Sequence, residues 1–409
     1  MNTVRVRVFY QTDPAGIISG GIDTFIRGMI KAAPADIEIS VVGLTTDAAA
    51  RPVGRWSECA VEGRRVWFFP VGRLRNPRGR SRIPLSLQLT AGIARHFHAC
   101  TSGCDVLEFH RVEPSLAFLR DERPKNVFIH TNLADATRDP HSDIRWKAAP
   151  WLFFLIERIA LCTVDSVYGV RSDAVAAYRA KYPQFASRFQ FIPTWMDPDI
   201  FFPAGATLRA QLRESLGIGP HERVCISVGR LESGKQPLLL LDGFALLAKR
   251  DPQARLVLVG DGALWRQIEA RTGEHGLAGR VTLTGLRPAR EVADLLRLSD
   301  CFVLTSAYEG MPMCVLEALG CGIPVVTTRV GEVERVVRPG INGEVLAEAT
   351  PDSVADALQT CLVRGYRAER CVSAVSEFVP KKVLQPVFEH YRRLARPAGV
   401  RPRVAEGFQ

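Results

Sequence analysis

The chain has 409 residues and a formal net charge of +10, with 47% hydrophobic and 23% charged residues. Its length suits two domains better than one core, and its ordinary composition excludes a wholly disordered chain. No run of about eighteen apolar residues predicts a spanning helix, and the start MNTVRVRVFY lacks the apolar segment of a secretion signal, so we expect a cytoplasmic protein. None of the 10 cysteines forms a CxxC pair, so we expect neither a disulfide framework nor a metal site.

Short apolar runs alternate with helical patterns along the whole chain, which is typical of parallel α/β domains. The first half predicts strands over residues 4–10, 38–44, 66–71, 105–109, 126–130, 165–170 and 189–192. The second half predicts strands over 223–228, 255–259, 280–283, 301–304 and 324–328, with amphipathic helices at 237–249 and 290–297.

Three prolines in IPTWMDPDIFFP, residues 192–203, interrupt this alternation and predict the connection between two domains. The predicted organisation is an N-terminal domain over 1–195 and a C-terminal domain over 196–379. A C-terminal helix, 380–396, should pack back towards the first domain, and 397–409 should form a tail.

Seven arginines crowd the stretch from Arg64 to Arg82, and interspersed proline and glycine predict that this stretch is a loop. The cluster is consistent with a solvated basic loop or with contact to an anionic membrane surface. It carries no nucleic-acid motif, so no nucleic-acid partner is expected. The apolar segment 151–164 favours a buried helix, with shallow membrane contact as the open alternative.

The first segment that carries chemistry is SVGRLESGK, residues 227–235, which directly follows an apolar strand. Gly229, Arg230 and Lys235 therefore lie just beyond the carboxyl end of a strand, where open α/β sheets bind ligands. An arginine fork and a mobile lysine charge can converge on a diphosphate. Taken alone, the segment also fits a solvated turn, and it does not match the P-loop pattern.

The second segment, residues 304–326, reads LTSAYEGMPMCVLEALGCGIPVV. It predicts a strand end, a loop with Glu309 and Gly310, and a helix with Pro312 at its first position. Free N–H groups at Met313 and its successor would form an anion site at the helix entrance.

Three polar side chains have both a structural and a functional interpretation. Glu317 lies inside the predicted helix among apolar residues, where a carboxylate needs either a structural partner or a ligand. His110 in EFHRVEPSL and His130 in VFIHTN each end a predicted strand. A hydrogen-bonded structural role is the more common one for a single such histidine.

In combination, these segments resemble the donor-binding domain of the retaining glycosyltransferases of family 4, also called group 1 glycosyltransferases. The matching pieces are VGRLESGK, LVLVGDG, VTLTGLRPAREVADLLRLSDCFVLTS and EGMPMCVLEALGCGIPVVTT, in the order of the family. The first half resembles the acceptor domain more loosely, through SGGID, the two histidine segments and the connector. In that connector, Thr194 and Trp195 replace the usual Asn-Gly.

The resemblance implies the GT-B fold, which is α/β with two Rossmann-like domains facing across a cleft, the first on the acceptor side and the second binding the donor. It implies transfer of a hexose-type sugar from a nucleotide-diphosphate donor to a glycan or lipid-linked acceptor. Retention of anomeric configuration, no metal ion and no cofactor belong to the same expectation. A lipid-linked acceptor would place the protein at the inner face of the membrane.

The resemblance also assigns residue roles. Arg230 and Lys235 would bind the diphosphate, Glu309 the hydroxyls of the sugar and Glu317 the ribose. His130 would lie near the transferred sugar, with His110 as second candidate. The residues implied for catalysis are Glu309, Arg230, Lys235 and His130, and those implied for donor binding are Gly20, Gly21, Gly229, Gly310, Met311, Pro312, Met313 and Glu317.

One segment departs from the family pattern, and three other functions are alternatives to sugar transfer. The family has Gly-Gly-x-Pro-Glu where this chain has GEVER, with Glu332 and Arg335 at the second glycine and the glutamate. A dinucleotide oxidoreductase is disfavoured because no GxGxxG follows the first strand. A nucleotide-sugar epimerase or hydrolase on the same fold remains an alternative, as does a non-catalytic basic binder of membrane or nucleic acid.

Overall fold

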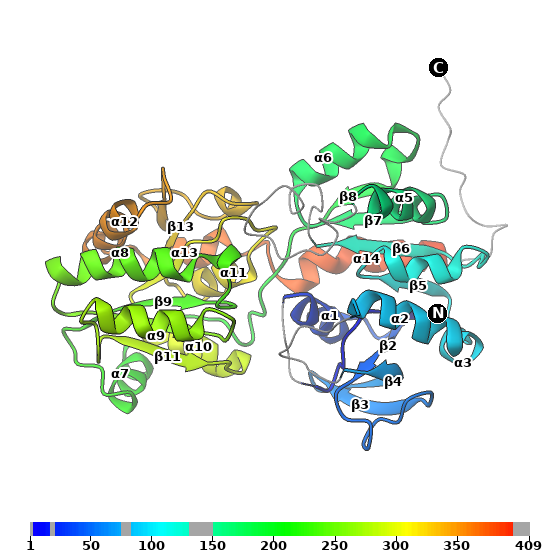
Figure 1. The fold of residues 1–409 in the computed structure, drawn as a ribbon, viewed down its shortest axis with the longest axis horizontal. Coiled ribbons are helices and arrows are strands. Elements are labelled where there is room, and N and C mark those ends of the chain that lie inside the picture. The colour runs from blue at the N-terminus through cyan, green and yellow to red at the C-terminus, as the bar shows by residue number, and fades with distance from the viewer. Residues whose placement is uncertain (1–2, 17–20, 75–82, 131–149, 396–409) are drawn as a thin grey trace. The chain divides into compact units, whose positions relative to one another are not determined.

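The computed structural model describes residues 3–16, 21–74, 83–130 and 150–395. The chain divides into two compact units inside the proline-rich segment 192–203. Unit 1 holds the described residues up to Pro193 together with helix α14 (Pro380–Leu394), and unit 2 holds Thr194–Val379 (Figure 1). Each unit contains a mainly parallel sheet with helices, which confirms the predicted α/β class with two Rossmann-like domains.

Unit 1 has an 8-stranded sheet in the order β3-β4-β2-β1-β5-β6-β7-β8. Its neighbouring strands are parallel except for the β3–β4 pair. The order reverses direction at β1, whose neighbours are β2 and β5. The strands are β1 (Val4–Phe9), β2 (Ile37–Thr45), β3 (Ser57–Val61), β4 (Arg64–Arg73), β5 (Val106–Phe109), β6 (Lys125–Ile129), β7 (Ser166–Gly169) and β8 (Phe189–Phe191).

The helices of unit 1 cover this sheet with apolar faces. Helix α14 comes from the far end of the sequence but lies beside α1, as the red ribbon among blue and cyan elements shows (Figure 1). It buries Leu384, Phe388 and Tyr391. The helices are α1 (Gly21–Ala32), α2 (Leu85–Arg95), α3 (Phe97–Thr101), η1 (Glu113–Phe118), α5 (Pro150–Leu161), α6 (Ser172–Lys181), η3 (Pro183–Arg188) and α14.

Strand β4 (Arg64–Arg73) confirms the strand predicted over residues 66–71, so the loop predicted for the whole arginine-rich stretch is wrong over these residues. Arg64 and Arg73 are the ends of β4, and Pro70 lies within it, paired with Gly43 of β2. The ladder has a register shift directly after Gly43, and such irregularities accommodate a residue that cannot donate a hydrogen bond. The later arginines of the cluster, residues 75–82, lie outside the described residues.

Unit 2 has a 6-stranded parallel sheet in the order β11-β10-β9-β12-β13-β14. Both faces of the central strand are buried, because Val224 and Ile226 enter one core cluster and Cys225 enters another. This explains the near-continuous apolar run of the strand. The strands are β9 (Arg223–Val228), β10 (Ala254–Val259), β11 (Val281–Gly285), β12 (Cys301–Leu304), β13 (Val325–Thr327) and β14 (Gly343–Val345).

Local signals fix the helix ends of unit 2. In α12, the Thr350 hydroxyl accepts a hydrogen bond from Ser353 N, Pro351 takes the first helical position, and Gly365 ends the helix in left-handed geometry. The helices are α7 (Ala206–Ser215), η4 (Ser233–Lys235), α8 (Pro237–Arg250), α9 (Trp265–Glu274), α10 (Ala289–Leu298), α11 (Met313–Gly320), η5 (Val333–Arg335), α12 (Pro351–Arg364) and α13 (Ala368–Ala374).

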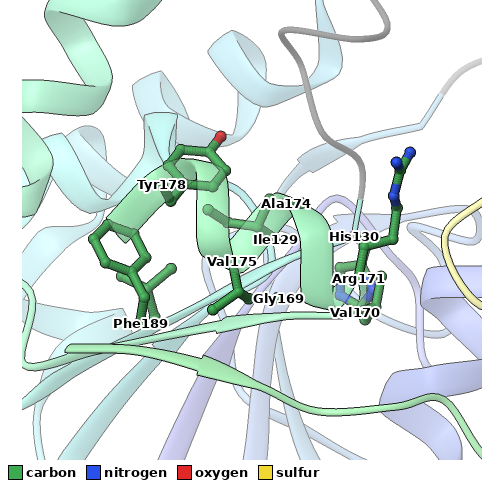
Figure 2. Close-up of a pocket in the computed structure, with 10 residues that line it drawn as sticks. Ile129, His130, Gly169, Val170, Arg171, Ala174, Val175, Tyr178 and Phe189 are labelled. Atoms are coloured by element: carbon green, nitrogen blue, oxygen red, sulfur yellow. The ribbon is translucent and has the colours of Figure 1, made fainter. Parts of the chain in front are cut away.

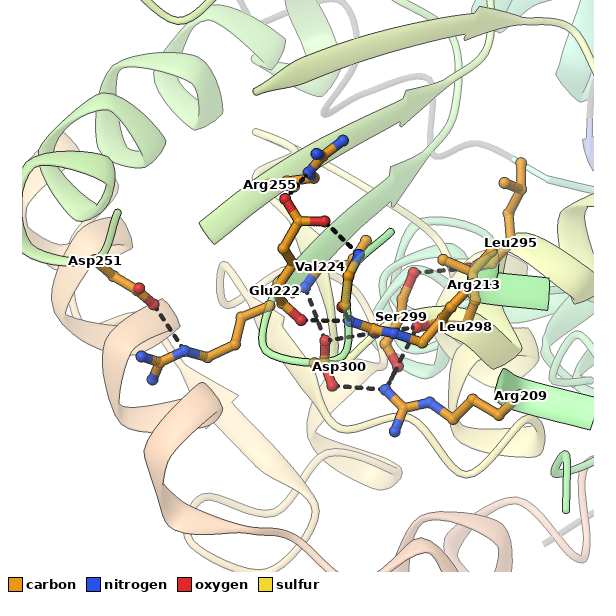
Figure 3. Close-up of polar contacts among 12 residues, drawn as sticks. Arg209, Arg213, Glu222, Val224, Asp251, Arg255, Leu295, Leu298, Ser299 and Asp300 are labelled. Atoms are coloured by element: carbon orange, nitrogen blue, oxygen red, sulfur yellow. Dashed lines mark hydrogen bonds and ion pairs between the residues drawn. The ribbon is translucent and has the colours of Figure 1, made fainter. Parts of the chain in front are cut away.

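A polar network fixes α7 to the sheet of unit 2, and Figure 3 shows it around Asp300. The Asp300 carboxylate accepts hydrogen bonds from Val224 N at 2.8 Å, Arg209 at 2.6 Å and Arg213 at 3.3 Å. This network joins α7 to the start of β9 and holds the first helix of unit 2 in place. Among the described residues, no helix combines the length and apolar character needed to cross a bilayer.

Candidate functional site

The two loops that carry the predicted donor residues lie at the point where the strand order of unit 2 reverses. Strands β9 and β12 are hydrogen-bonded neighbours at that point. Ligands of open α/β sheets bind beside the carboxyl ends of the strands at such switch points. The loop after β9 carries Gly229, Arg230 and Lys235, and the loop after β12 carries Glu309 and Gly310.

Lys235 Nζ forms a hydrogen-bonded ion pair with Glu309 Oε1 across the two loops. Ser306 Oγ donates to the same oxygen at 2.7 Å. The Lys235 and Glu309 side chains are only 29% and 13% exposed. Burial lowers the pKa of Lys235, but the Glu309 carboxylate raises it, and the net pKa lies above the usual value. The ammonium group therefore stays charged beside the carboxylate.

Arg230 is the more exposed cation of the site, with 59% of its side chain accessible. Its guanidinium pairs with Glu232 at 2.8 Å, an exposed contact of little energetic value. The charge of Arg230 also lowers the pKa of Lys235, which shows that the two cations are close enough to interact. A Cβ atom added to Gly229 would lie 4.0 Å from Lys235 Cε, so the lysine stem passes over this glycine.

Hydrogen bonds to backbone carbonyl oxygens fix the two loops to each other. Thr305 Oγ1 donates to the carbonyl oxygens of Lys235 and Gln236, both at 3.1 Å, and Ala307 N donates to Gly234 O at 2.9 Å. Gln236 has a φ of 48° and a ψ of 48°, in the left-handed region that residues other than glycine rarely adopt. Such strained positions concentrate at functional sites, where surrounding contacts hold them.

The segment from Gly310 to Met313 leads into α11. Helix α11 begins at Met313 with Pro312 as its N-cap, so the prediction of Pro312 at the first helical position is wrong by one residue. Pro312 has a ψ of 113°, which is extended rather than helical. Met311 is buried and its carbonyl accepts a hydrogen bond from Thr194 Oγ1 at 2.8 Å. The first N–H groups of α11 have no intrahelical acceptor, which suits an anionic ligand.

Glu317 lies on α11 in a partly buried position. Burial raises the pKa of its carboxyl group to about 7. Within the described part of the chain, no side chain or backbone group forms a hydrogen bond or ion pair with this carboxyl group. A desolvated carboxyl group without a structural partner is a candidate ligand contact.

The segment that departs from the family pattern packs on the loop of Glu309. Gly331 has a φ of 51°, and a Cβ atom there would lie 1.8 Å from Gly310 O. Glu332 N donates to the same oxygen at 3.0 Å. The Glu332 side chain forms an ion pair with Arg335. The backbone of this segment therefore supports the Glu309 loop. The two side chains that differ from the family pattern, Glu332 and Arg335, contact each other.

The glycine pair of unit 1 is only partly described, because Gly20 lies outside the described residues. Gly21 is the exposed first residue of α1, and a Cβ atom added to it would meet nothing within 4 Å. A side chain at position 21 would therefore meet none of the described residues of unit 1.

The two candidate histidines of unit 1 lie side by side at the carboxyl ends of β5 and β6. His110 Nδ1 and His130 Nε2 are 2.9 Å apart, and His110 Nε2 is 2.9 Å from Glu108 Oε1. His110 is buried, whereas His130 is partly exposed. Burial lowers the pKa of His110 to about 3 and that of His130 well below its usual value, so both rings are neutral at physiological pH.

A small apolar cavity lies beside His130, lined by Val175, Tyr178 and Phe189 among others (Figure 2). Its volume is about 10 Å³, room for about one water molecule. This cavity is too small for a sugar. The loops that follow the carboxyl ends of β9 and β12 are therefore the better candidates for the ligand-binding surface.

Comparison with known proteins assigns a family to the C-terminal part of the chain. Residues 209–378 match the family model of the glycosyl transferases group 1. This part of the chain is a group 1 glycosyltransferase domain. The matched range contains both loops of unit 2, including Arg230, Lys235, Glu309 and Glu317.

The relatives that resemble this chain are also glycosyltransferases or sugar-phosphate synthases by name. Mannosylfructose-phosphate synthase of Agrobacterium fabrum is 34% identical over 36% of this chain, and the match spans only 34% of that relative's length. D-inositol 3-phosphate glycosyltransferase of Xylanimonas cellulosilytica is 27% identical over 86% of this chain and 85% of the relative. The second comparison extends the relationship to both units.

A solved structure agrees on the fold. Sucrose-phosphate synthase from Thermosynechococcus elongatus superimposes with a TM-score of 0.78 over 96% of this chain and 99% of that protein, at 20% identity. At this identity the likeness concerns the fold, which is the GT-B arrangement of two parallel-sheet domains.

Sequence reasoning missed Ser306 and Glu108, which contact the candidate residues Glu309 and His110, and also missed Tyr391, which contacts Glu108. Glu108 and His110 are two residues apart in EFH, which puts both on one face of a strand, and that spacing could have indicated their contact. Tyr391 offers no such signal, because it reaches Glu108 from α14 at a separation of 283 residues.

Proposed function

We propose that the protein transfers a hexose-type sugar from a nucleotide-diphosphate donor to a glycan or lipid-linked acceptor, with retention of anomeric configuration and without a metal ion. The observation that carries the proposal is the contact of Lys235 with Glu309 at the β9–β12 switch point. A cation for the diphosphate and a carboxylate for sugar hydroxyls are thereby adjacent. Family membership supports the reaction class.

The leaving nucleotide diphosphate accumulates negative charge as its bond to the anomeric carbon breaks. In the proposal, Lys235 and Arg230 stabilise this charge together with the N–H groups at Met313 and Cys314, and such fixed donors commonly supply several kcal/mol of transition-state stabilisation. No metal ion is required if these groups carry out that task. Glu317 would accept hydrogen bonds from the ribose hydroxyls, which would satisfy its unpartnered carboxyl group.

When the donor binds, the charged side chains of the site should give up their contacts with each other and contact the donor instead. The Lys235 ammonium would turn from Glu309 to the diphosphate, and Glu309 would then accept hydrogen bonds from the sugar. Arg230 would leave its exposed contact with Glu232 at little cost. In unit 1, Gly20 and Gly21 would allow close approach of the backbone to the donor, and His130 would contact the transferred sugar.

The central test is donor turnover in single variants. Thermal stabilisation by a panel of UDP-, GDP- and ADP-sugars first identifies the donor, since a ligand of the native state raises its stability. Arg230→Ala and Lys235→Ala should then each lower kcat/KM by on the order of 100-fold or more. Lys249→Ala, an exposed lysine on α8, serves as control and should keep wild-type kinetics. Unchanged kinetics in Lys235→Ala would refute the proposed site.

Product analysis separates transfer from its alternatives. D-inositol 3-phosphate, the compound in the name of the relative that matches both units, and lipid-linked glycans serve as acceptor probes. A transferase forms a glycoside only with acceptor, whereas an epimerase or hydrolase converts the donor alone. If no metal ion is needed, activity should be unchanged in EDTA. If the configuration is retained, an axial donor should give an axial product linkage.

A second proposal concerns membrane contact by unit 1, which would suit a lipid-linked acceptor. Helix α5 exposes Trp151, Leu155 and Ile159 at 69%, 49% and 40%, spaced four residues apart on one helix face. Exposed apolar stripes of this kind support shallow insertion between lipid head groups. Exposed arginines at both ends of β4 add positive charge.

Vesicle co-sedimentation tests this second proposal. Vesicles of phosphatidylcholine with phosphatidylglycerol should bind the protein, and neutral phosphatidylcholine vesicles should bind it less. Trp151→Ser with Leu155→Ser, and separately Arg64→Glu with Arg73→Glu, should each weaken binding. Equal sedimentation of all variants would contradict membrane contact.

A further inference from the structure

A continuous row of hydrogen-bonded side chains runs through unit 1 and ends at His130. It begins at the Tyr391 hydroxyl on α14, which contacts Glu108 Oε2. Glu108 Oε1 is 2.9 Å from His110 Nε2, and His110 Nδ1 is 2.9 Å from His130 Nε2. His130 is the partly exposed end of the row, and the other three side chains are buried.

Strand geometry and aromatic packing hold the row in register. Glu108 and His110 point to the same face of the sheet because they are two positions apart at the end of β5. Phe128 of β6 stacks on His110 with 5.1 Å between ring centroids. Phe25 of α1 packs edge-on against both His110 and His130, at 5.6 Å and 4.9 Å. Both imidazole rings are therefore held in fixed orientations.

Nothing around Glu108 compensates a negative charge. Its side chain and that of His110 are 0% exposed. Within the described part of the chain, no lysine or arginine lies within ion-pairing distance of Glu108. The side-chain amide of Asn126, its neighbour in register on β6, has no hydrogen-bond partner and so does not donate to it. A buried carboxyl group in these surroundings favours its neutral form.

A neutral Glu108 that accepts from the Tyr391 hydroxyl at Oε2 fixes the direction of the other hydrogen bonds in the row. The Tyr391 hydroxyl donates to Glu108 Oε2, and the carboxyl proton on Oε1 is donated to His110 Nε2. His110 must then carry its proton on Nδ1 and donate it to His130 Nε2. His130, with an accepting Nε2, must carry its own proton on Nδ1. A carboxylate at Glu108 would reverse the last two bonds and leave Nδ1 of His130 as an acceptor.

We propose that Glu108 and His110 are positioning residues that hold His130 as the Nδ1–H tautomer, so that it donates a hydrogen bond to an oxygen of the transferred sugar. The inference rests on the proposed function, because it gives His130 its sugar contact. Glu108 acts from inside the sheet of unit 1 and touches no substrate. The proton on Glu108, rather than a negative charge, sets the tautomer of His110 and through it the tautomer of His130.

Two substitutions at one position test the direction of the row. Glu108→Gln keeps the shape, since its amide N–H₂ donates to His110 Nε2 and its oxygen accepts from Tyr391. We expect a kcat within about twofold of wild type, because the same tautomers persist. Glu108→Leu removes the donor and frees both rings to exchange tautomers. It should lower kcat by on the order of 10- to 100-fold, the usual effect of removing a partner that orients a working histidine.

Tyr391→Phe is the matched control for a purely structural role. It removes the hydrogen bond between α14 and Glu108 but leaves the carboxyl group of Glu108 donating to His110. Its Tm should fall, while kcat should stay near wild type. If Tyr391→Phe lowers kcat as much as Glu108→Leu does, the row only supports the fold and the proposal fails.

The tautomers can be read directly from ¹⁵N chemical shifts of the imidazole nitrogens in the donor-free protein, assigned with His110 and His130 variants. Wild type and Glu108→Gln should both show Nδ1–H for the two histidines. Nε2–H tautomers in wild type, or a large loss of kcat in Glu108→Gln, would overturn the proposal. This measurement needs no turnover, so it stands even if Lys235→Ala shows the proposed function to be wrong.

Discussion

Gly331→Ala tests whether the segment after β13 fixes the loop that carries Glu309. The Ala side chain would enter a backbone conformation with φ near 51°, and its Cβ atom would lie 1.8 Å from Gly310 O and 2.8 Å from Glu309 O. Left-handed geometry alone costs an alanine about 1 to 2 kcal/mol. Relief of the clash with backbone atoms adds about 1 to 3 kcal/mol, as for other overpacked sites.

The expected total is about 2 to 5 kcal/mol, and a unit of this size loses about 2 to 4 °C in Tm per kcal/mol. We therefore expect Gly331→Ala to lower Tm by on the order of 10 °C and to raise the KM for the donor, because the Glu309 loop must move. Gly276→Ala is the control, since Gly276 has a φ of 66° but an added Cβ atom meets nothing within 4 Å. It should lose about 2 to 8 °C with unchanged KM.

Scanning calorimetry of both variants, followed by donor kinetics, gives the comparison. If Gly331→Ala loses no more stability than Gly276→Ala, the contact with Gly310 is not rigid. The reasoning from this close approach would then be wrong.

Two further predictions concern the remaining polar groups of unit 2. Asp300→Ala should destabilise the protein by about 2 kcal/mol, because Val224 N and two arginines lose an acceptor. The control is Asp356→Ala, which removes an exposed ion pair with Arg250 and should cost less than about 0.5 kcal/mol. Urea unfolding measures both changes in the free energy of unfolding. Glu317→Gln should stabilise the protein at pH 8 but not at pH 5. The raised pKa of Glu317, about 7, means that the native state keeps a proton that the unfolded chain releases near its ordinary value of 4.5. Stability therefore falls as pH rises through this window, and the variant escapes a loss of about 1 to 3 kcal/mol. An equal change in Tm at both pH values would contradict this assignment.

The elements of unit 2 and its candidate residues could be predicted from sequence because local rules determine them. An apolar run ending at Val228, followed by Gly229 and Arg230, already indicates a buried strand and a ligand loop. The helices around residues 237–250 and 289–298 follow from proline and from apolar spacing. These features depend on neighbours within a few residues, which a sequence displays directly.

The pairing of the strand at Arg64–Arg73 and the row ending at His130 depended on tertiary structure instead. The apolar residues 66–71 predicted a strand, whereas the prolines and glycines predicted a loop, and pairing with β2 made the segment a strand. Lys235 meets Glu309, 74 residues away, only because β9 and β12 are neighbours in the sheet. Tyr391 meets Glu108 only because α14 returns to unit 1. Local propensity selects the elements, but strand order and helix packing decide which side chains share a site.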